Sequence, residues 1–145
     1  LFNIQCKNEL WEYNPANDSW TKKANFPGTC RYFASGFAVN GKGYIGLGRD
    51  QLTQSQSLTD FWQYDPVTNT WTQKAQFPGP GRDIAVGFSI GNKGYLGTGS
   101  VPIAQSTFTY YSDFWEYNPG SDTWTQKANV PGLGRGYAVG ISLNG

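Results

Sequence analysis

One segment of this chain occurs three times. The stretch DFWQYDPVTNTWTQKAQFPGPGR at 60–82 recurs as DFWEYNPGSDTWTQKANVPGLGR at 113–135 and as ELWEYNPANDSWTKKANFPGTCR at 9–31. The first tryptophans of the copies are 51 and then 53 residues apart. A period near 50 with aromatic and glycine markers is typical of an array of β units. Because one such unit cannot bury its own apolar face, stability must come from packing between units.

Each repeat contains four short strand signals. In the copy that begins at 82 they are expected at 85–90 (AVGFSI), 93–99 (KGYLGTG), 113–117 (DFWEY) and 123–127 (TWTQK). Gly91-Asn92 predicts a hairpin turn, because both residues tolerate positive φ. Residues 100–112 are expected to form a polar and aromatic loop. Four antiparallel strands per repeat is the content of one β-propeller blade, so we predict an all-β fold.

The repeat markers resemble those of kelch repeats. The second strand ends in Gly-X-Gly, the third strand contains a tyrosine, and a tryptophan follows that tyrosine by seven residues. These pairs are Tyr13 and Trp20, Tyr64 and Trp71, and Tyr117 and Trp124. The resemblance covers essentially the whole chain and implies kelch-type β-propeller blades, about three repeats of a six- or seven-bladed ring. One departure is that the usual kelch double glycine is here a Gly-X-Gly.

The repeat divides the chain into four parts. A partial blade with the third and fourth strands is expected at 1–31, kelch repeats at 32–82 and 83–135, and the first strand of a further blade at 136–145. Three blades are too few to close a ring. The further blades are therefore expected from the same longer chain, or from a second copy that associates head to tail.

The composition limits the chemistry of the chain. The net charge is +1 and the lysines are scattered, whereas a nucleic-acid partner needs a clustered basic face. The chain contains no histidine, which removes the usual copper and zinc ligands, so neither a cofactor nor a metal site is predicted. Catalytic residues are not predicted either, because most candidate carboxylates, such as Asp60 and Asp113, have repeat explanations.

The sequence also predicts a location for the protein. No stretch approaches the roughly 18 apolar residues of a membrane span. The low charge and a possible Cys6–Cys30 disulfide favour an oxidising compartment. The turn sequences also resemble those of galactose-oxidase-like kelch proteins of bacterial cell surfaces. We therefore expect an extracellular or cell-surface protein.

Strand polarity places the loops on two faces. The loops between second and third strands (49–59 and 100–112) share one face with the segments that join the blades. These loops differ in length and chemistry, whereas the turns on the opposite face are nearly identical between repeats. Ligands tend to bind variable loops on a rigid scaffold. We call the first face the variable face and predict ligand binding there.

Three arginines, Arg31, Arg82 and Arg135, begin the innermost strands on the variable face. In a closed ring they would form a cationic collar suited to carboxylate or phosphate groups. Alternatively, each arginine pairs with an acidic residue, since Glu9, Asp60 and Asp113 begin third strands on the same face. Both explanations stay open on sequence alone.

The predicted ligand-binding set also includes residues that vary between repeats. Positions after the arginines differ: Tyr32, Asp83 and Gly136, then Phe33, Ile84 and Tyr137. Such differences are what an asymmetric pocket needs. The complete predicted set is Arg31, Tyr32, Arg49, Arg82, Asp83, Tyr110, Tyr111, Arg135 and Tyr137. Tyr110 and Tyr111 belong to the longer loop, with Phe108, where they either stack on a ligand or cover the blade edge. The six tryptophans occupy repeat-equivalent strand positions and are expected in the core.

We therefore predict a non-catalytic recognition module, a secreted or surface kelch propeller that binds a protein or a glycan. Two alternatives stay open. The chain is a segment of a carbohydrate-active kelch enzyme whose catalytic residues lie elsewhere, or it is a structural subunit of a surface complex.

Overall fold

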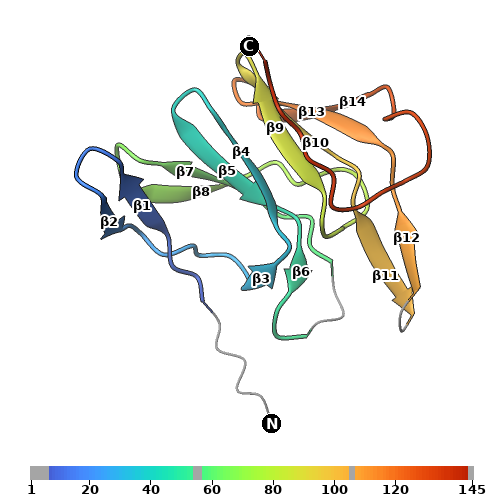
Figure 1. Ribbon diagram of the computed structural model, residues 1–145, viewed down its shortest axis with the longest axis horizontal. Coiled ribbons are helices and arrows are strands. Elements are labelled where there is room, and N and C mark those ends of the chain that lie inside the picture. Colours follow the sequence, from blue (N-terminus) through green and yellow to red (C-terminus); the bar gives the residue numbers. More distant parts are fainter. Residues whose placement is uncertain (1–6, 54–56, 105–106, 144–145) are drawn as a thin grey trace.

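The chain folds into two complete blades. The computed structural model describes residues 7–53, 57–104 and 107–143. The first blade is an antiparallel sheet in the order β4-β5-β7-β8, and the second has the order β9-β10-β13-β14 (Figure 1). Their strands are β4 (Ser35–Val39), β5 (Lys42–Gly46), β7 (Phe61–Asp65), β8 (Thr70–Lys74), β9 (Val86–Ile90), β10 (Lys93–Gly97), β13 (Phe114–Asn118) and β14 (Thr123–Lys127). The all-β prediction with four strands per blade is confirmed.

No helix forms in the described ranges, and hence none that would pass through a lipid bilayer. The second strand of each blade ends where the backbone turns left-handed. Strand β10 was expected to reach Gly99, but it ends at Gly97 because Thr98 and Gly99 have φ values of 58° and 94°. These positive φ angles take the chain out of the hydrogen-bonded ladder and into the loop on the variable face.

A half-blade precedes the two blades. Strands β1 (Trp11–Asn14) and β2 (Ser19–Lys22) pair with each other and correspond to the third and fourth strands of a blade. At the other end, residues 136–143 form no strand and run beside β9, where Val139 and Ile141 share a hollow with Val86 and Phe88 (Figure 1). The further blade predicted from 136–145 stays a prediction.

The expected loop at 100–112 was wrong in part. Residues Ser100–Ala104 and Thr107–Tyr110 form a hairpin, β11 and β12, which pairs Ser100 with Tyr110. The β-branched and aromatic residues of this stretch favour such strands. A second short pair joins β3 (Arg31–Tyr32) to β6 (Arg49–Asp50). Both pairs extend from the variable face, which is the lower side in Figure 1.

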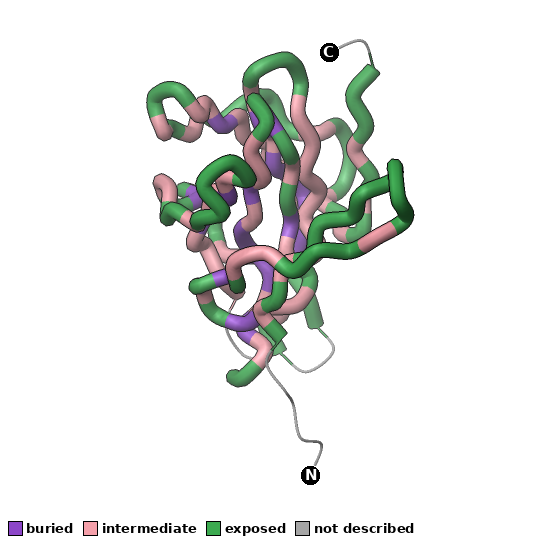
Figure 2. Tube along the Cα trace, turned by 90° about the vertical axis from the view of Figure 1, so that its left-hand side faces the viewer, coloured by how far each residue is buried: buried purple, intermediate pink, exposed green. Residues whose placement is uncertain are grey.

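The main core lies between the two blades. Its buried apolar residues are Val39, Tyr44, Leu47, Phe61, Phe77, Leu96 and Tyr117. The inner strands β4 and β9 lie side by side, so one blade covers the face of the next. Gly94 permits this close approach, because a Cβ atom there would overlap the ring of Phe37 from the other blade. Figure 2 shows the buried segments in the interior and the turns exposed.

The prediction that all six tryptophans lie in the core was wrong for two of them. Trp11 and Trp20 of the half-blade are 47% and 64% exposed. Their equivalents in the two complete blades are half-buried and pack on a phenylalanine of the preceding repeat: Trp62 and Trp71 on Phe26, and Trp115 and Trp124 on Phe77. Burial of these indoles requires a preceding repeat, and none of the described residues supplies one for Trp11 and Trp20.

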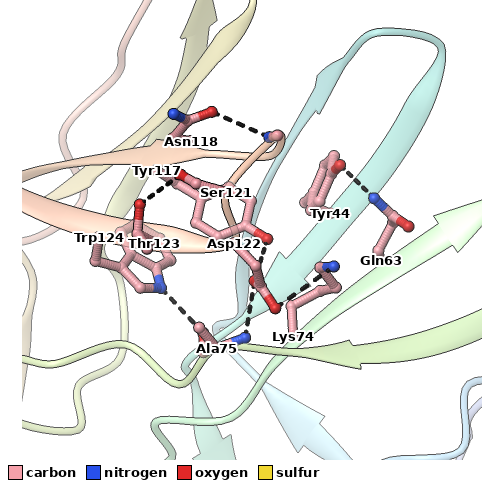
Figure 3. Close-up of polar contacts among 11 residues, drawn as sticks. Tyr44, Gln63, Lys74, Ala75, Tyr117, Asn118, Ser121, Asp122, Thr123 and Trp124 are labelled. Carbon is pink, nitrogen blue, oxygen red and sulfur yellow. Dashed lines mark hydrogen bonds and ion pairs between the residues drawn. The ribbon is translucent and has the colours of Figure 1, made fainter.

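A turn residue in each blade holds the blade before it. Asp122 lies between β13 and β14 with a φ of 54°, and its carboxylate accepts hydrogen bonds from the Tyr117 hydroxyl (2.6 Å) and the Ala75 amide (3.0 Å) (Figure 3). The indole of Trp124 donates to the Ala75 carbonyl at 3.0 Å. Lys74 adds an ion pair with Asp122 at 3.5 Å. We call this group of contacts the turn clamp.

The turn clamp recurs one blade earlier. Asn69 replaces Asp122 there, with a φ of 54°, and accepts hydrogen bonds from the Tyr64 hydroxyl and the Ala24 amide at 2.9 and 2.8 Å. Asn and Asp tolerate the left-handed region better than other residues with a side chain. This tolerance explains why the position holds only these two residue types in the two complete blades.

Replacement of Asp122 tests the clamp. Asp122→Ala should lower the free energy of unfolding by roughly 2–3 kcal/mol, because it removes two hydrogen bonds and places alanine at a positive φ. Asp122→Asn reproduces the residue of the preceding blade and should change stability by less than about 1 kcal/mol. Urea denaturation followed by tryptophan fluorescence measures both. Equal losses in the two variants would contradict the clamp.

Candidate functional site

Two of the predicted arginines are held inside their own blades. Arg31 forms a two-pronged ion pair with Asp60, with N–O distances of 2.8 and 2.6 Å, and donates to the Leu47 carbonyl. Arg82 pairs with Asp113 in the same way and donates to the Thr98 carbonyl at 2.9 Å.

Arg82 is fully buried, and its guanidinium lies between the rings of Phe77 and Tyr111, 5.0 and 4.2 Å from their centres. Its side chain therefore has no accessible surface for a ligand. Of the two explanations for Arg31 and Arg82, the structure supports the structural one. The proposed cationic collar does not arise from these two residues.

A tryptophan completes each arginine–carboxylate group. The indoles of Trp62 and Trp115 donate to Asp60 and Asp113, each at 2.7 Å. Burial alone raises the pKa of both carboxyl groups. Hydrogen bonds from the arginine and the tryptophan together outweigh burial and hold each pKa below its usual value. Both carboxylates therefore stay ionised and paired at neutral pH.

Arg135 occupies the equivalent position but is exposed. Its Nε donates to the Leu133 carbonyl at 3.2 Å, just as the Nε of Arg82 donates to Pro80. No acidic side chain within the described ranges pairs with Arg135. Its Nη2, which in Arg31 and Arg82 donates to a carboxylate, here donates to the Pro131 carbonyl at 2.5 Å.

The varied positions Arg49 and Asp83 form an ion pair between the blades. Arg49 belongs to β6 of the first blade, and its guanidinium lies 5.7 Å from the ring centre of Tyr32. Asp83 begins the second blade, is 1% exposed, and accepts a hydrogen bond from the Ser100 hydroxyl at 3.1 Å. One repeat later, the equivalent residues are Ser100 and Gly136, which carry no charge. This ion pair therefore occurs once among the described repeats.

The residues that follow the varied positions have an unusual backbone. Phe33, Ile84 and Tyr137 have φ values of 58°, 51° and 56°. The Ile84 amide donates to the Phe33 carbonyl, and the Tyr137 amide donates to the Ile84 carbonyl, both at 3.2 Å. Positive φ is uncommon for residues with a side chain and is a clear outlier for β-branched isoleucine. This backbone relay joins three successive repeats at the inner edge of the variable face.

Three aromatic rings gather on this relay. Phe33 packs edge-on against Tyr32 and Tyr137, with ring centres 4.9 and 6.3 Å away. Phe33 is 48% exposed and Tyr137 is 74% exposed. We call Tyr32, Phe33 and Tyr137 the aromatic rim. The rim is an accessible apolar surface beside the Arg49–Asp83 ion pair, an arrangement that suits a ligand with both apolar and polar faces.

The hairpin tyrosines lie at different depths. Tyr111 stacks on the buried Arg82, whereas Tyr110 is exposed and lies near Phe108, with ring centres 6.3 Å apart. A Cβ atom at Gly136 would contact the Tyr110 ring at 3.5 Å, which places Tyr110 close to the residue before Tyr137. Of the two predicted tyrosines, Tyr110 is the one available beside the rim.

The other predicted groups are placed as follows. Cys30 is buried and disulfide-bonded. Cys6, its predicted partner, lies outside the described residues, so the Cys6–Cys30 pairing stays a prediction. The described residues contain no group of three or more His, Cys, Asp or Glu side chains that would hold a metal ion.

Sequence reasoning placed Tyr32, Arg49, Asp83 and Tyr137 in the candidate set, and the structure brings them together. It left out Phe33 and Ile84, although both positions were seen to vary. An alignment of the repeats could have identified them, because these positions vary while the residues around them are the same in each repeat. The chain gives no sequence sign of their left-handed backbone, because Phe and Ile disfavour it.

The stacked four-stranded blades define the molecule as an array of β-propeller blades. Comparison with known proteins adds the repeat type: the Kelch motif matches residues 43–78, which include β7, β8 and all but the first residue of β5. The chain is therefore built of kelch-type repeats, as its markers predicted.

Three similar proteins illustrate the match. An N-acetylneuraminate epimerase of Yersinia enterocolitica is 29% identical over 153 residues, which covers 82% of this chain and 39% of the relative. An F-box/kelch-repeat protein of Arabidopsis thaliana is 28% identical over 138 residues, covering 94% of this chain and 34% of the relative. The solved structure of YjhT shares the fold with a TM-score of 0.76 at 18% identity, covering 89% and 47% of the two chains. This chain thus spans less than half the length of each of these proteins.

The role of the buried arginine can be tested by making the same substitution at Arg82 and at its exposed equivalent, Arg135. Arg82→Lys should lower the free energy of unfolding by roughly 3–5 kcal/mol. Lysine cannot form the two-pronged ion pair, so the Asp113 carboxylate loses at least one of its hydrogen bonds from residue 82. Arg135→Lys, at the exposed equivalent position, should change it by less than about 0.5 kcal/mol. Urea denaturation compares them. Similar values for both variants would show that the buried pair is dispensable.

The depressed carboxyl pKa values predict acid sensitivity. A carboxyl group whose pKa is lower in the folded chain stabilises the fold above its unfolded pKa of about 4 and loses this contribution as pH falls through the folded pKa. The free energy of unfolding should therefore decrease below about pH 4. Asp60→Asn should reduce that decrease. If the free energy of unfolding of Asp60→Asn depended on pH as in the parent chain, this carboxylate would have no part in the acid sensitivity.

Proposed function

We propose that this chain is a recognition segment of a kelch propeller and that it binds a sugar at the aromatic rim. The left-handed backbone of Phe33, Ile84 and Tyr137 carries the proposal. Such residues cost of order 1–3 kcal/mol each, and strained positions cluster at ligand sites. Here the strain holds two large rings at the inner edge of the blades, where they stay exposed.

The chemistry of the rim suits a carbohydrate. Exposed aromatic rings offer flat apolar surfaces for the C–H faces of a sugar ring. Arg49 lies against Tyr32 and keeps 15% of its side chain exposed. A guanidinium beside an aromatic surface favours a sugar that carries a carboxylate. The rim therefore combines contacts for both parts of an acidic sugar.

The relatives suggest which acidic sugar to test. The N-acetylneuraminate epimerases of Yersinia enterocolitica and Haemophilus influenzae match 82% and 83% of this chain. N-acetylneuraminate is a sugar with one carboxylate, the ligand type inferred from the rim. We therefore propose N-acetylneuraminate, free or at the end of a glycan, as the ligand.

A second candidate function is catalytic, and the names of these relatives favour it. In this alternative the chain is part of an epimerase that acts on N-acetylneuraminate. The carboxyl group nearest the rim, that of Asp83, is buried and paired with Arg49, which suits positioning better than proton transfer. Catalytic groups would then come from outside the described residues, and the rim would hold the substrate.

We also propose an extracellular or cell-surface location. The disulfide state of Cys30 supports it, because such bonds persist in oxidising compartments. The low proportion of charged residues, 14%, agrees with the composition expected there.

Titration with N-acetylneuraminate tests the rim. Tyr137→Ala and Phe33→Ala should each weaken binding roughly two- to twelvefold, because one aromatic contact contributes about 0.5–1.5 kcal/mol. Val67→Ala changes an exposed residue in the turn between β7 and β8, on the face opposite the rim, and should leave the affinity unchanged. Calorimetry gives the dissociation constants, and proton NMR of the same samples reports any accelerated interconversion of epimers. Equal affinity in Tyr137→Ala and the parent chain would overturn the rim site, and accelerated interconversion would replace recognition by catalysis.

A further inference from the structure

A hollow of about 440 Å³ lies on the first blade, away from the aromatic rim. Its walls come from the segment before Arg31, the end of the loop that precedes β7, and the strands β7 and β8. The lining side chains used below are Thr29, Leu58, Asp60, Trp62, Gln73 and Gln76. None of the rim residues contributes to it, so the hollow is a separate feature of the variable face.

The hollow contains uncommitted hydrogen-bonding groups. The side-chain amides of Gln73 and Gln76 are exposed, and neither is hydrogen-bonded to another described residue. The Ser57 hydroxyl, also in the lining, is buried and has no partner within the described part of the chain. The two exposed amides are therefore the groups of the lining that can reach the hydroxyl groups of a ligand.

One wall of the hollow is a fixed aromatic ring. The Trp62 indole donates to Asp60 at 2.7 Å, and Phe26 packs edge-on against it with ring centres 5.7 Å apart. Gln73 pairs with Trp62 across β7 and β8, so the amide and the ring project from the same side of the sheet. A rigid ring next to amide and hydroxyl groups is a suitable surface for a sugar.

The charge of the hollow favours a neutral ligand. Asp60 is the one ionisable side chain in its lining, and its carboxylate is paired with Arg31 at 2.6 Å. Arg31 itself does not line the hollow. An anionic ligand would meet a carboxylate without a free cation, whereas hydroxyl groups of a neutral sugar can donate to it.

The second blade shows what closes this position. Tyr111 is the equivalent of Leu58, and the backbone amides of both donate to a glycine carbonyl at 2.9 and 2.8 Å. The Tyr111 ring extends over Arg82, 4.2 Å from its guanidinium carbon. Pro80 likewise replaces Thr29. Leu58 thus lines the hollow at a position where the second blade carries an aromatic ring.

We propose that the hollow beside Trp62 binds one neutral sugar unit of a glycan. Trp62 supplies the stacking surface, Gln73 and Gln76 bind hydroxyl groups, and Asp60 accepts from another hydroxyl. This site is independent of the aromatic rim and differs from it in selecting uncharged units. A glycan with a neutral residue and a terminal acidic residue would then have two separate points of attachment on the variable face.

A glycan array tests the hollow. The array presents galactose-, glucose-, mannose- and N-acetylhexosamine-terminated oligosaccharides, together with the same oligosaccharides capped with sialic acid. The chain should bind a subset of the uncapped glycans. Leu58→Tyr, which copies the second blade, should reduce this binding at least tenfold, and Gln73→Ala should reduce it severalfold.

Matched variants in the second blade serve as controls. Gln126→Ala and Asn129→Ala change the residues equivalent to Gln73 and Gln76 and should leave the binding of uncapped glycans unchanged, as should Tyr137→Ala at the rim. Absence of binding to every uncapped glycan, or full binding by a folded Leu58→Tyr variant, would overturn the proposal. Loss of uncapped binding in Tyr137→Ala would assign it to the rim instead, and would also overturn the separate site.

Discussion

The pairing of a buried arginine with an aspartate organises each blade. In the second blade, Arg82 connects the segment that enters the blade, the end of β10 through the Thr98 carbonyl, and the start of β13 through Asp113. Three chain segments that meet on the variable face are thereby fixed by one guanidinium. Truncating such a buried pair leaves an unpaired charge, which makes it essential to the fold rather than to recognition. The loops on this face can vary because this group holds their ends.

Variation on a fixed frame explains where both proposed sites lie. The rim occupies positions 32, 33 and 137, which lie one or two residues after the arginines and differ from repeat to repeat. The hollow depends on Leu58, which precedes the paired Asp60 by two residues. In both cases a repeated arginine–aspartate contact holds the backbone, and the side chains beside it differ between the repeats.

The sequence predicted the blades well because each strand carries its own marker, such as Tyr117 in β13 and Trp124 in β14. It predicted the rim partly, since repeat comparison exposed Tyr32 and Tyr137 as variable. The hairpin β11–β12 was missed because it has no counterpart in the repeat. Exposure of Trp20 was missed as well, because its burial depends on a neighbouring repeat and not on its own strand.

The turn clamp has a direction. Asp122 and Trp124 hold Ala75 of the preceding repeat, and Asn69 and Trp71 hold Ala24 one repeat earlier. Each blade is thus fastened by the blade that follows it in the chain. During synthesis, a newly made blade gains these contacts only when the next turn emerges from the ribosome. The blade at the growing end of the chain therefore lacks the turn-clamp contacts until one more repeat has been made.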